Sequence, residues 1–192
     1  MPSSRHRLLD AARAVILAVG WRRATLTDVA RRAGVSRMTV YRAFPDMQSH
    51  LAELMTRELV GQVGAVVGGE DASGADRAAD VLAREFTAAV GALRQNELFR
   101  RIMDVDPEQL LPYLLDRCGR SQDAVIDILS ARIAAAQSTG GVRDADPVLM
   151  ARSLVLAAHG FALSVATMTD DVLAPADFDT QLATLARRYL AP

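Results

Sequence analysis

The chain has 192 residues, of which 51% are hydrophobic and 23% are charged, and its formal net charge is −1. This composition is typical of a folded soluble protein and excludes a disordered acidic or Pro/Gly-rich chain. The charge is distributed unevenly, because residues 1–50 hold nine arginines against three aspartates, a net +6, which leaves −7 on residues 51–192. A basic first quarter indicates that this part of the chain faces a polyanion.

The single cysteine, Cys118, offers neither a disulfide nor the spacing of a metal site. A reducing compartment is therefore the simplest interpretation, and we expect a cytoplasmic protein without metal or cofactor. The longest uncharged stretch, Ser153 to Thr169, falls short of the roughly 20 residues that cross a bilayer. We therefore expect a helix buried in protein rather than a membrane span.

The first 45 residues predict three helices. Leu8, Ala12 and Ile16 recur at helical spacing before Gly20, which can end the first helix in the left-handed conformation. The segment 25–28 (TLTD) has the form in which a threonine caps a helix and an acid occupies its first turn. After a turn at Gly34, Ser36 can cap a third helix.

Two short helices joined by Ala33-Gly34-Val35-Ser36 predict a helix-turn-helix, with Val40 and Phe44 on the inner face of its second helix. Asp46 can cap a long fourth helix that runs to about Val66. Residues 68–74 (GGEDASG) predict a linker. Further helices are expected over about 75–94, 97–104, 107–138 with a possible break near 118–119, 147–168 and 175–190. The predicted fold class is all-α, with about nine helices and no β alternation.

The stretch from Thr25 to Leu51 resembles the DNA-binding signature of the TetR family of bacterial transcription regulators. Val29-Ala30, Ala33-Gly34-Val35-Ser36, Thr39-Val40-Tyr41, Phe44 and Leu51 match it in order and spacing. The resemblance covers residues 1–55 strongly and the remainder only in helical layout. It implies a DNA-binding domain over 1–46 and a ligand-binding and dimerisation domain over 47–192.

Two positions depart from the family pattern. Met47 stands where the family commonly has a phosphate-binding lysine, and Met38 stands where a small residue or proline is frequent. The first change should weaken contact with the DNA backbone. The second should alter base preference.

A recognition helix offers its outer, N-terminal face to base edges in the major groove. Arg37 can donate two hydrogen bonds to guanine, while Met38 and Thr39 can contact thymine methyl groups. Tyr41 suits a phosphate, although it can also pack beside Phe44, and the capping residues suit phosphates in addition to their local role. The predicted DNA-binding residues are Thr25, Thr27, Ser36, Arg37, Met38, Thr39, Tyr41 and Arg42. Other arginines (5, 22, 23, 31, 32) would add salt-sensitive attraction, Arg31 and Arg32 being first of all solvated surface charge.

The resemblance also implies a small-molecule pocket in the body. Its predicted lining consists of the larger or softer side chains Met55, Phe86, Phe99, Met103, Cys118 and His159, although plain core is the simpler interpretation of each one taken singly. No phosphate loop, metal cluster or nucleophile elbow is present, and His159 has no acid nearby in its helix, so we expect no catalytic residues and no enzyme.

One recognition helix reads only a few base pairs, so useful affinity normally requires two copies on a palindrome. In the family the last two helices pair with those of a second copy. The predicted interface comprises Leu154, Ala158, Phe161, Val165, Leu182, Leu185 and Tyr189, and intramolecular core is the alternative for each.

These observations predict a homodimeric regulator that binds a palindromic operator in double-stranded DNA. It would most simply be a repressor that a small-molecule effector releases. The alternative is a helical receptor or protein-interaction module with weak or no operator binding, which the methionine at position 47 favours.

Overall fold

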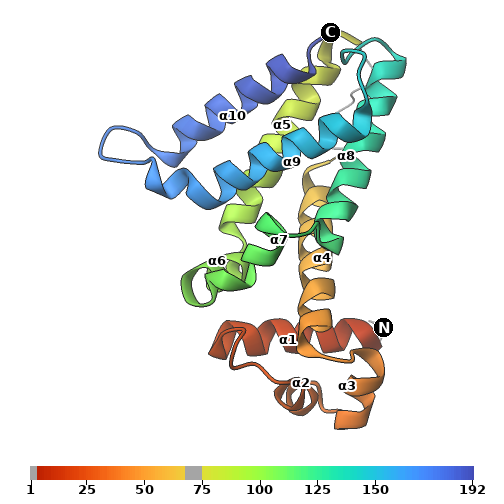
Figure 1. Cartoon of the computed structure of the whole chain (residues 1–192), viewed down its shortest axis with the longest axis vertical. Coiled ribbons are helices and arrows are strands. Elements are labelled where there is room, and N and C mark those ends of the chain that lie inside the picture. Colours follow the sequence, from red (N-terminus) through yellow and green to blue (C-terminus); the bar gives the residue numbers. More distant parts are fainter. Residues whose placement is uncertain (1–3, 68–74) are drawn as a thin grey trace. The chain divides into compact units, whose positions relative to one another are not determined.

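A computed structural model describes residues 4–67 and 75–192. All regular structure within these ranges is helical, as expected (Figure 1). The elements are α1 (Ser4–Val19), α2 (Leu26–Ala33), α3 (Arg37–Ala43), α4 (Met47–Val66), α5 (Ala75–Gln95), α6 (Glu97–Val105), η1 (Pro107–Gln109), α7 (Leu111–Leu115), α8 (Arg120–Ser138), α9 (Pro147–Ser164), η2 (Val165–Thr167) and α10 (Pro175–Leu190). The linker predicted at 68–74 lies outside the described residues.

The described part of the chain contains ten α-helices, one more than expected. The difference arises in the segment 107–138, where the break expected near 118–119 separates α7 from α8. Pro107 and Pro112 each lie in the first turn of a short helix, where a missing backbone N–H costs nothing. The helical class predicted from the sequence is therefore confirmed.

The chain divides into two compact units. The first joins residues 1–58 to residues 95–121, and the second joins 59–94 to 122–192, so that the division falls within α4. The functional boundary predicted between residues 46 and 47 stays a prediction, because this division reflects packing alone.

The core of the first unit is built by α1 to α4 together with α6. Leu8, Ile16, Val40 and Phe44 are buried in it. Leu98 of α6 joins the same cluster, which explains why a segment distant in sequence belongs to this unit. Burial of this apolar surface is the main stabilising contribution, at roughly 25 cal/mol per Å².

A polar contact fixes the turn that follows α1. The buried Asp106, at the end of α6, accepts hydrogen bonds from the backbone N–H groups of Trp21 (2.7 Å) and Arg22 (3.4 Å). The indole N–H of Trp21 donates to the side-chain oxygen of Gln109 at 2.8 Å. The α1–α2 turn is therefore held by residues some 85 positions further along the chain.

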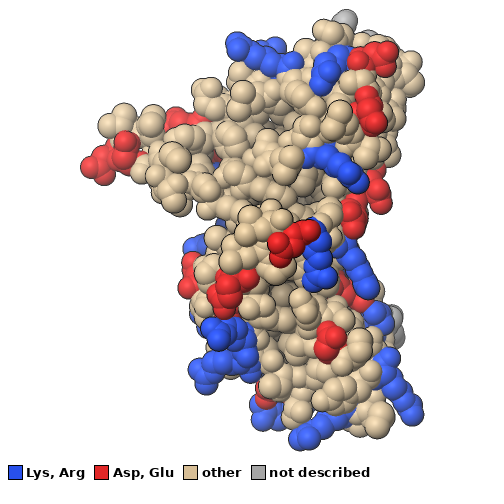
Figure 2. Space-filling view, viewed as in Figure 1, with Lys and Arg blue, Asp and Glu red and all other residues tan. Residues whose placement is uncertain are grey.

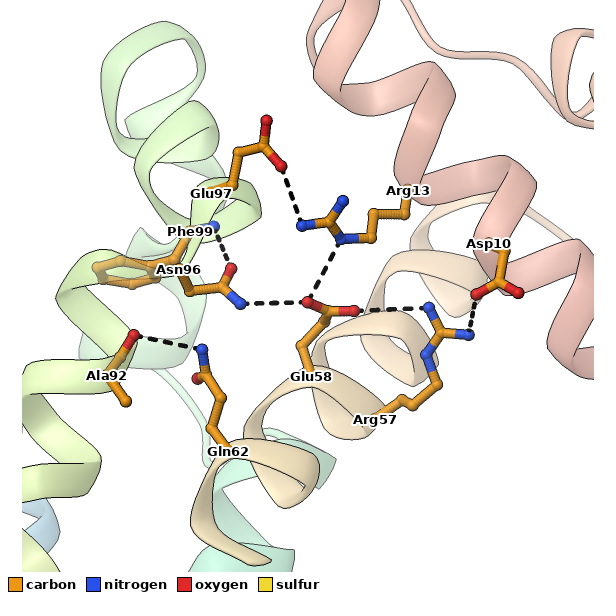
Figure 3. A network of polar contacts seen from close by, with 9 residues as sticks. All are labelled: Asp10, Arg13, Arg57, Glu58, Gln62, Ala92, Asn96, Glu97 and Phe99. Atoms are coloured by element: carbon orange, nitrogen blue, oxygen red, sulfur yellow. Dashed lines mark hydrogen bonds and ion pairs between the residues drawn. The ribbon is translucent and has the colours of Figure 1, made fainter. Parts of the chain in front are cut away.

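A second polar network joins α1, α4 and α6 around Glu58 (Figure 3). Its carboxylate accepts a hydrogen bond from Asn96 (3.1 Å) and lies 3.5 Å from the Arg13 guanidinium. The side-chain oxygen of Asn96 also caps α6 by accepting from the N–H of Phe99 at 2.9 Å. Arg13 continues to Glu97 at 3.1 Å. Arg13 of α1 therefore pairs with an acidic side chain of α4 and with one of α6.

The second unit is a helical body whose core lies between α5, α8, α9 and α10. Phe86, Ile133, Met150 and Leu182 are buried there. Ion pairs join its helices, among them Arg132 with Glu85 at 2.5 Å, Arg94 with Asp179 at 2.5 Å and Arg187 with Asp80 at 3.8 Å.

Candidate nucleic-acid interface

Local sequence explains the turn between α2 and α3. The hydroxyl oxygen of Thr25 accepts a hydrogen bond from the N–H of Asp28 at 3.1 Å and donates to its carboxylate at 2.6 Å. Gly34 then adopts φ +66°, a left-handed conformation that residues with a Cβ rarely adopt. Ser36 caps α3 by accepting from the N–H of Thr39 at 3.2 Å. The predicted helix-turn-helix and both of its caps are confirmed.

The helix α3 has a buried face and an exposed face. Val40, and Phe44 directly after the helix, are almost inaccessible to solvent, as predicted. On the opposite side Met38 is 61% exposed and Tyr41 is 52% exposed, with Arg37 also at the surface. Tyr41 therefore does not pack into the core beside Phe44.

The other predicted contact residues surround this face. Arg42 and Thr25 are exposed, and Thr27 is half-buried. Thr39 is also half-buried, and its hydroxyl lies 2.9 Å from that of Ser36. This hydrogen bond joins the cap to the first turn of α3 and leaves the Thr39 methyl group as the part suited to an apolar contact.

The arginines of the first 50 residues fall into two groups. Arg5, Arg13, Arg22 and Arg31 form ion pairs with carboxylates of the same unit. Within the described residues five others form none: Arg7, Arg23, Arg32, Arg37 and Arg42. Figure 2 shows arginine side chains at the surface of the region that Figure 1 labels α1 to α3. The positive charge there is therefore only partly neutralised by the protein itself.

A buried histidine supports the end of α3. The ring of His50 stacks on that of Phe44, with centroids 3.7 Å apart and planes 8° from parallel. The Arg5 guanidinium lies 4.6 Å from the centre of the Phe44 ring and pairs with Glu53. Burial lowers the pKa of His50 to about 4, so the ring is neutral at pH 7. The hydrogen bond from Arg5 lowers the pKa of Glu53.

Sequence reasoning missed His50, Asp106 and Gln109. His50 follows helical spacing on a mostly apolar face, but nothing local marks a polar ring as core. The contacts of Asp106 and Gln109 depend on a chain crossing that no short pattern encodes. Arg5, expected to add salt-sensitive attraction, instead lies over Phe44 as part of the structural support of α3.

The predicted pocket residues are shared between the two units. Met55, Phe99, Met103 and Cys118 belong to the first, whereas Phe86 and His159 belong to the second. Phe86 lines a small apolar cavity of about 40 Å³ whose wall contains residues of α4, α5 and α8. This wall is formed by Val63, Val67, Leu82, Glu85, Phe86, Ala89, Val125, Ile128, Leu129 and Arg132.

Cys118 and His159 do not line that cavity. The exposed Cys118 lines a cleft of about 260 Å³ in the first unit, together with Tyr113, Arg117 and Arg120. His159 lies 3.0 Å from the side-chain nitrogen of Gln122 in the second unit, and burial lowers its pKa.

The predicted interface residues differ in burial. Leu154, Val165 and Leu182 are buried in the core of their own protomer, the alternative that the sequence left open. Ala158, Phe161 and Tyr189 are half-buried, and Leu185 is 56% exposed.

The helix α9 is apolar along most of its length but is buried on one face only. Leu149 (63%) and Leu156 (71%) are exposed, and a shallow apolar groove of about 440 Å³ follows α9 to Met168 and Phe178. By length and composition alone Pro147–Thr167 could cross a membrane, and 22% of it is buried within the protein. The expectation of a buried helix therefore holds for its inner face, and its outer face presents apolar surface to solvent.

Comparison with known proteins places these features in context. Residues 8–54 match the family model described as bacterial regulatory proteins, tetR family. The chain is 34% identical to an HTH-type transcriptional regulator of Mycobacterium tuberculosis strain H37Rv over 184 residues, which cover 96% of this chain and 93% of the relative.

Solved structures share the fold. The TetR-family transcriptional repressor QsdR of R. erythropolis superposes with a TM-score of 0.71 at 15% identity, covering 98% of this chain and 96% of its own. The regulator FadR of Bacillus subtilis, solved with stearoyl-CoA, gives a TM-score of 0.62 at 13% identity, covering 96% and 98%.

Proposed function

The chain belongs to the TetR family of bacterial transcription regulators, and we propose that it is a cytoplasmic homodimeric repressor that a small molecule releases from a palindromic operator. The exposed outer face of α3, on a helix held by caps at Thr25 and Ser36, is the observation that carries the DNA-binding part of this proposal.

On this proposal, Arg37 reads guanine through two hydrogen bonds, and Met38 with the Thr39 methyl group contacts thymine. Tyr41 and Arg42 contact phosphates that set the register of the helix. Thr25, Thr27 and Ser36 do the same at the helix starts, where backbone N–H groups favour anions. Support comes from the exposure of Met38 and Tyr41, whose adjacent apolar surfaces are stabilised by burial against a partner, with the unpaired charge of Arg37 beside them.

The test begins with selection of bound fragments from random duplex DNA, followed by affinity measurements on the selected sequence and on single-base variants. Arg37→Ala should lose discrimination at one position of each half-site, by about 5- to 150-fold. The matched control, Arg32→Ala on α2, should weaken binding evenly across sequences and make it less dependent on salt. Unchanged affinity and base preference in Arg37→Ala would contradict the assignment.

The proposed effector site is the apolar cavity between α4, α5 and α8. Its wall is almost entirely hydrocarbon, apart from the Arg132–Glu85 ion pair, which favours a mostly apolar ligand. A cavity of about 40 Å³ is much smaller than a typical ligand site, so a ligand must displace its wall. Val63 of that wall belongs to α4, the helix that begins directly after the DNA-binding segment, and Val67 follows the end of this helix.

Filling the cavity tests this site. Ala89→Leu places extra atoms in the wall, whereas Ala88→Leu adds the same atoms at the exposed neighbouring position. Screening by thermal shift should find apolar compounds that stabilise the wild type and the Ala88→Leu control. The same compounds should fail to stabilise Ala89→Leu or to release it from DNA, and an equal response of the two variants would refute the location.

The proposed dimer covers the exposed face of α9. A helix with this much apolar surface is stabilised by burial against a partner. A Cβ at Gly160 would meet no atom within 4 Å in the protomer, so Gly160→Leu tests the face without disturbing the fold. Sedimentation should show that Gly160→Leu dissociates the dimer, while the control Gly61→Leu, which has the same open surroundings on α4, leaves it intact.

The alternative function is a receptor or interaction module that binds DNA weakly. Met47, half-buried at the start of α4, favours it because the side chain supplies no charge for a phosphate. Failure to select any duplex, together with ligand binding in the thermal-shift screen, would support this alternative over a repressor.

A further inference from the structure

The hairpin formed by α9 and α10 carries opposite charges at its two ends. The connecting loop holds Asp170 and Asp171, beside Val172, which is 85% exposed. The other end holds Arg152 on α9 and Arg188 on α10, both exposed. Acidic atoms mark the tip of this loop in Figure 2. The hairpin is therefore polarised along its length.

The charges at both ends lack partners inside the protomer. In the described ranges Asp171, Arg152 and Arg188 form no ion pair within 4 Å. Asp170 differs, because its carboxylate accepts from the N–H groups of Val172 (2.8 Å) and Leu173 (2.7 Å) and so shapes the loop. Asp171 is thus the loop carboxylate that can be changed without altering the turn.

The two arginines share the apolar face that the proposed dimer covers. Arg152 lies three residues after the exposed Leu149 and four before the exposed Leu156, and Arg188 lies three after the exposed Leu185. Residues three and four apart lie on the same side of a helix. A partner seated on this face therefore also meets the arginines.

Symmetry restricts how two such hairpins can meet. In a twofold interface the same patch faces itself, so parallel hairpins would place acid against acid and arginine against arginine. Antiparallel hairpins place the acidic loop of each copy against the basic end of the other. Gly160 lies eight residues from Arg152, about 12 Å along α9, and the loop that holds Asp171 follows on its other side, beyond Thr167. An axis beside Gly160 therefore brings the acidic loop of one copy toward the basic end of the other.

We infer that attraction between Asp171 of one copy and the Arg152–Arg188 end of the other orients the homodimer as an antiparallel hairpin pair and disfavours the parallel one. This inference rests on the proposed dimer and adds the side chains that determine its orientation. Opposite charges at the rim of an apolar interface mainly provide this kind of specificity, because wrong pairings become repulsive.

Charge-reversal variants test the inferred attraction between the two copies. Asp171→Arg, and separately Arg152→Glu with Arg188→Glu, should each weaken dimerisation about tenfold or more, since each turns attraction into repulsion at both ends of the interface. A chain with all three substitutions restores opposite charges between copies and should dimerise as the wild type does. Asp127→Arg, an exposed charge reversal on α8, serves as the control and should change nothing.

The outcomes separate this inference from the dimer itself. If Asp171→Arg dimerises like the wild type while Gly160→Leu still dissociates, the dimer stands and the charge-based orientation is wrong. A parallel pair would give that result, because Asp171→Arg would only replace repulsion between two acidic loops by repulsion between two arginines. A wild-type chain that is monomeric at micromolar concentration overturns both proposals. Thermal melting of each variant checks that the protomer remains folded.

Discussion

The buried imidazole of His50 should make the first unit lose stability in mild acid. The ring is completely inaccessible to solvent and stacks on Phe44. Burial lowers its pKa to about 4, whereas an unfolded chain leaves it at about 6.5. Between these two values the unfolded state binds the proton and the folded state does not. Stability is therefore complete above pH 6.5 and is lost as the pH falls toward 4.

The size of the effect follows from this difference in pKa. A shift of about 2.5 units corresponds to about 3 kcal/mol when fully developed, near pH 4, and to about 2 kcal/mol between pH 7 and pH 5. That loss is large compared with a typical domain stability of about 5 to 15 kcal/mol. Glu53 and Asp46, whose pKa values are lowered, lose their contributions only at more acidic pH.

Tryptophan fluorescence during urea unfolding is the appropriate measurement. The only tryptophan, Trp21, is buried in the same core as Phe44, so it reports on the unit that contains His50. His159, whose pKa is also lowered, lies in the other unit and affects this signal little. His50→Leu replaces the imidazole with an apolar side chain and should abolish most of the change between pH 7 and pH 5. A wild type as stable at pH 5 as at pH 7 would refute the reasoning.

Three further predictions concern stability. Gly34→Ala should cost about 1 kcal/mol in urea unfolding followed by fluorescence, because φ +66° strains a residue with a Cβ even though space is open there. Asp106→Ala should cost about 1 to 3 kcal/mol in the same assay and shift the Trp21 emission, because the buried N–H of Trp21 loses its acceptor. Leu154→Ala should lower protomer stability by about 2 to 5 kcal/mol in circular dichroism melts, whereas Leu185→Ala should leave a monomeric variant almost unchanged.

The sequence predicted those parts of the fold that depend on neighbouring residues. A cap such as Ser36 and a turn such as Gly34 are decided within three or four positions, and the structure confirms both. The four-residue spacing of apolar side chains likewise identified Val40 and Phe44 as the inner face of α3 and its end. The placement of the candidate DNA-binding side chains follows from these local rules.

Contacts between distant segments could not be predicted in this way. Asp106 resembles any acid at the end of a helix until α6 is placed against α1. Helical spacing shows that Leu154 and Leu185 each lie on an apolar face, but not whether the covering surface belongs to the same protomer. The structure distinguishes the two residues, because Leu154 is 4% exposed and Leu185 is 56% exposed.

The charge of the first 50 residues overstates what is available to DNA. Four of its nine arginines already have carboxylate partners, and Arg13 and Arg5 hold helices of the first unit together. Salt dependence of DNA binding counts the phosphates that a protein neutralises rather than its total charge. On the proposed function, the unpaired Arg37 and Arg42 on α3 would release counterions from DNA without breaking a protein contact. Arg7, Arg23 and Arg32 also form no ion pair within the described residues, so the unpaired positive charge is shared between α3 and the α1–α2 surface beside it.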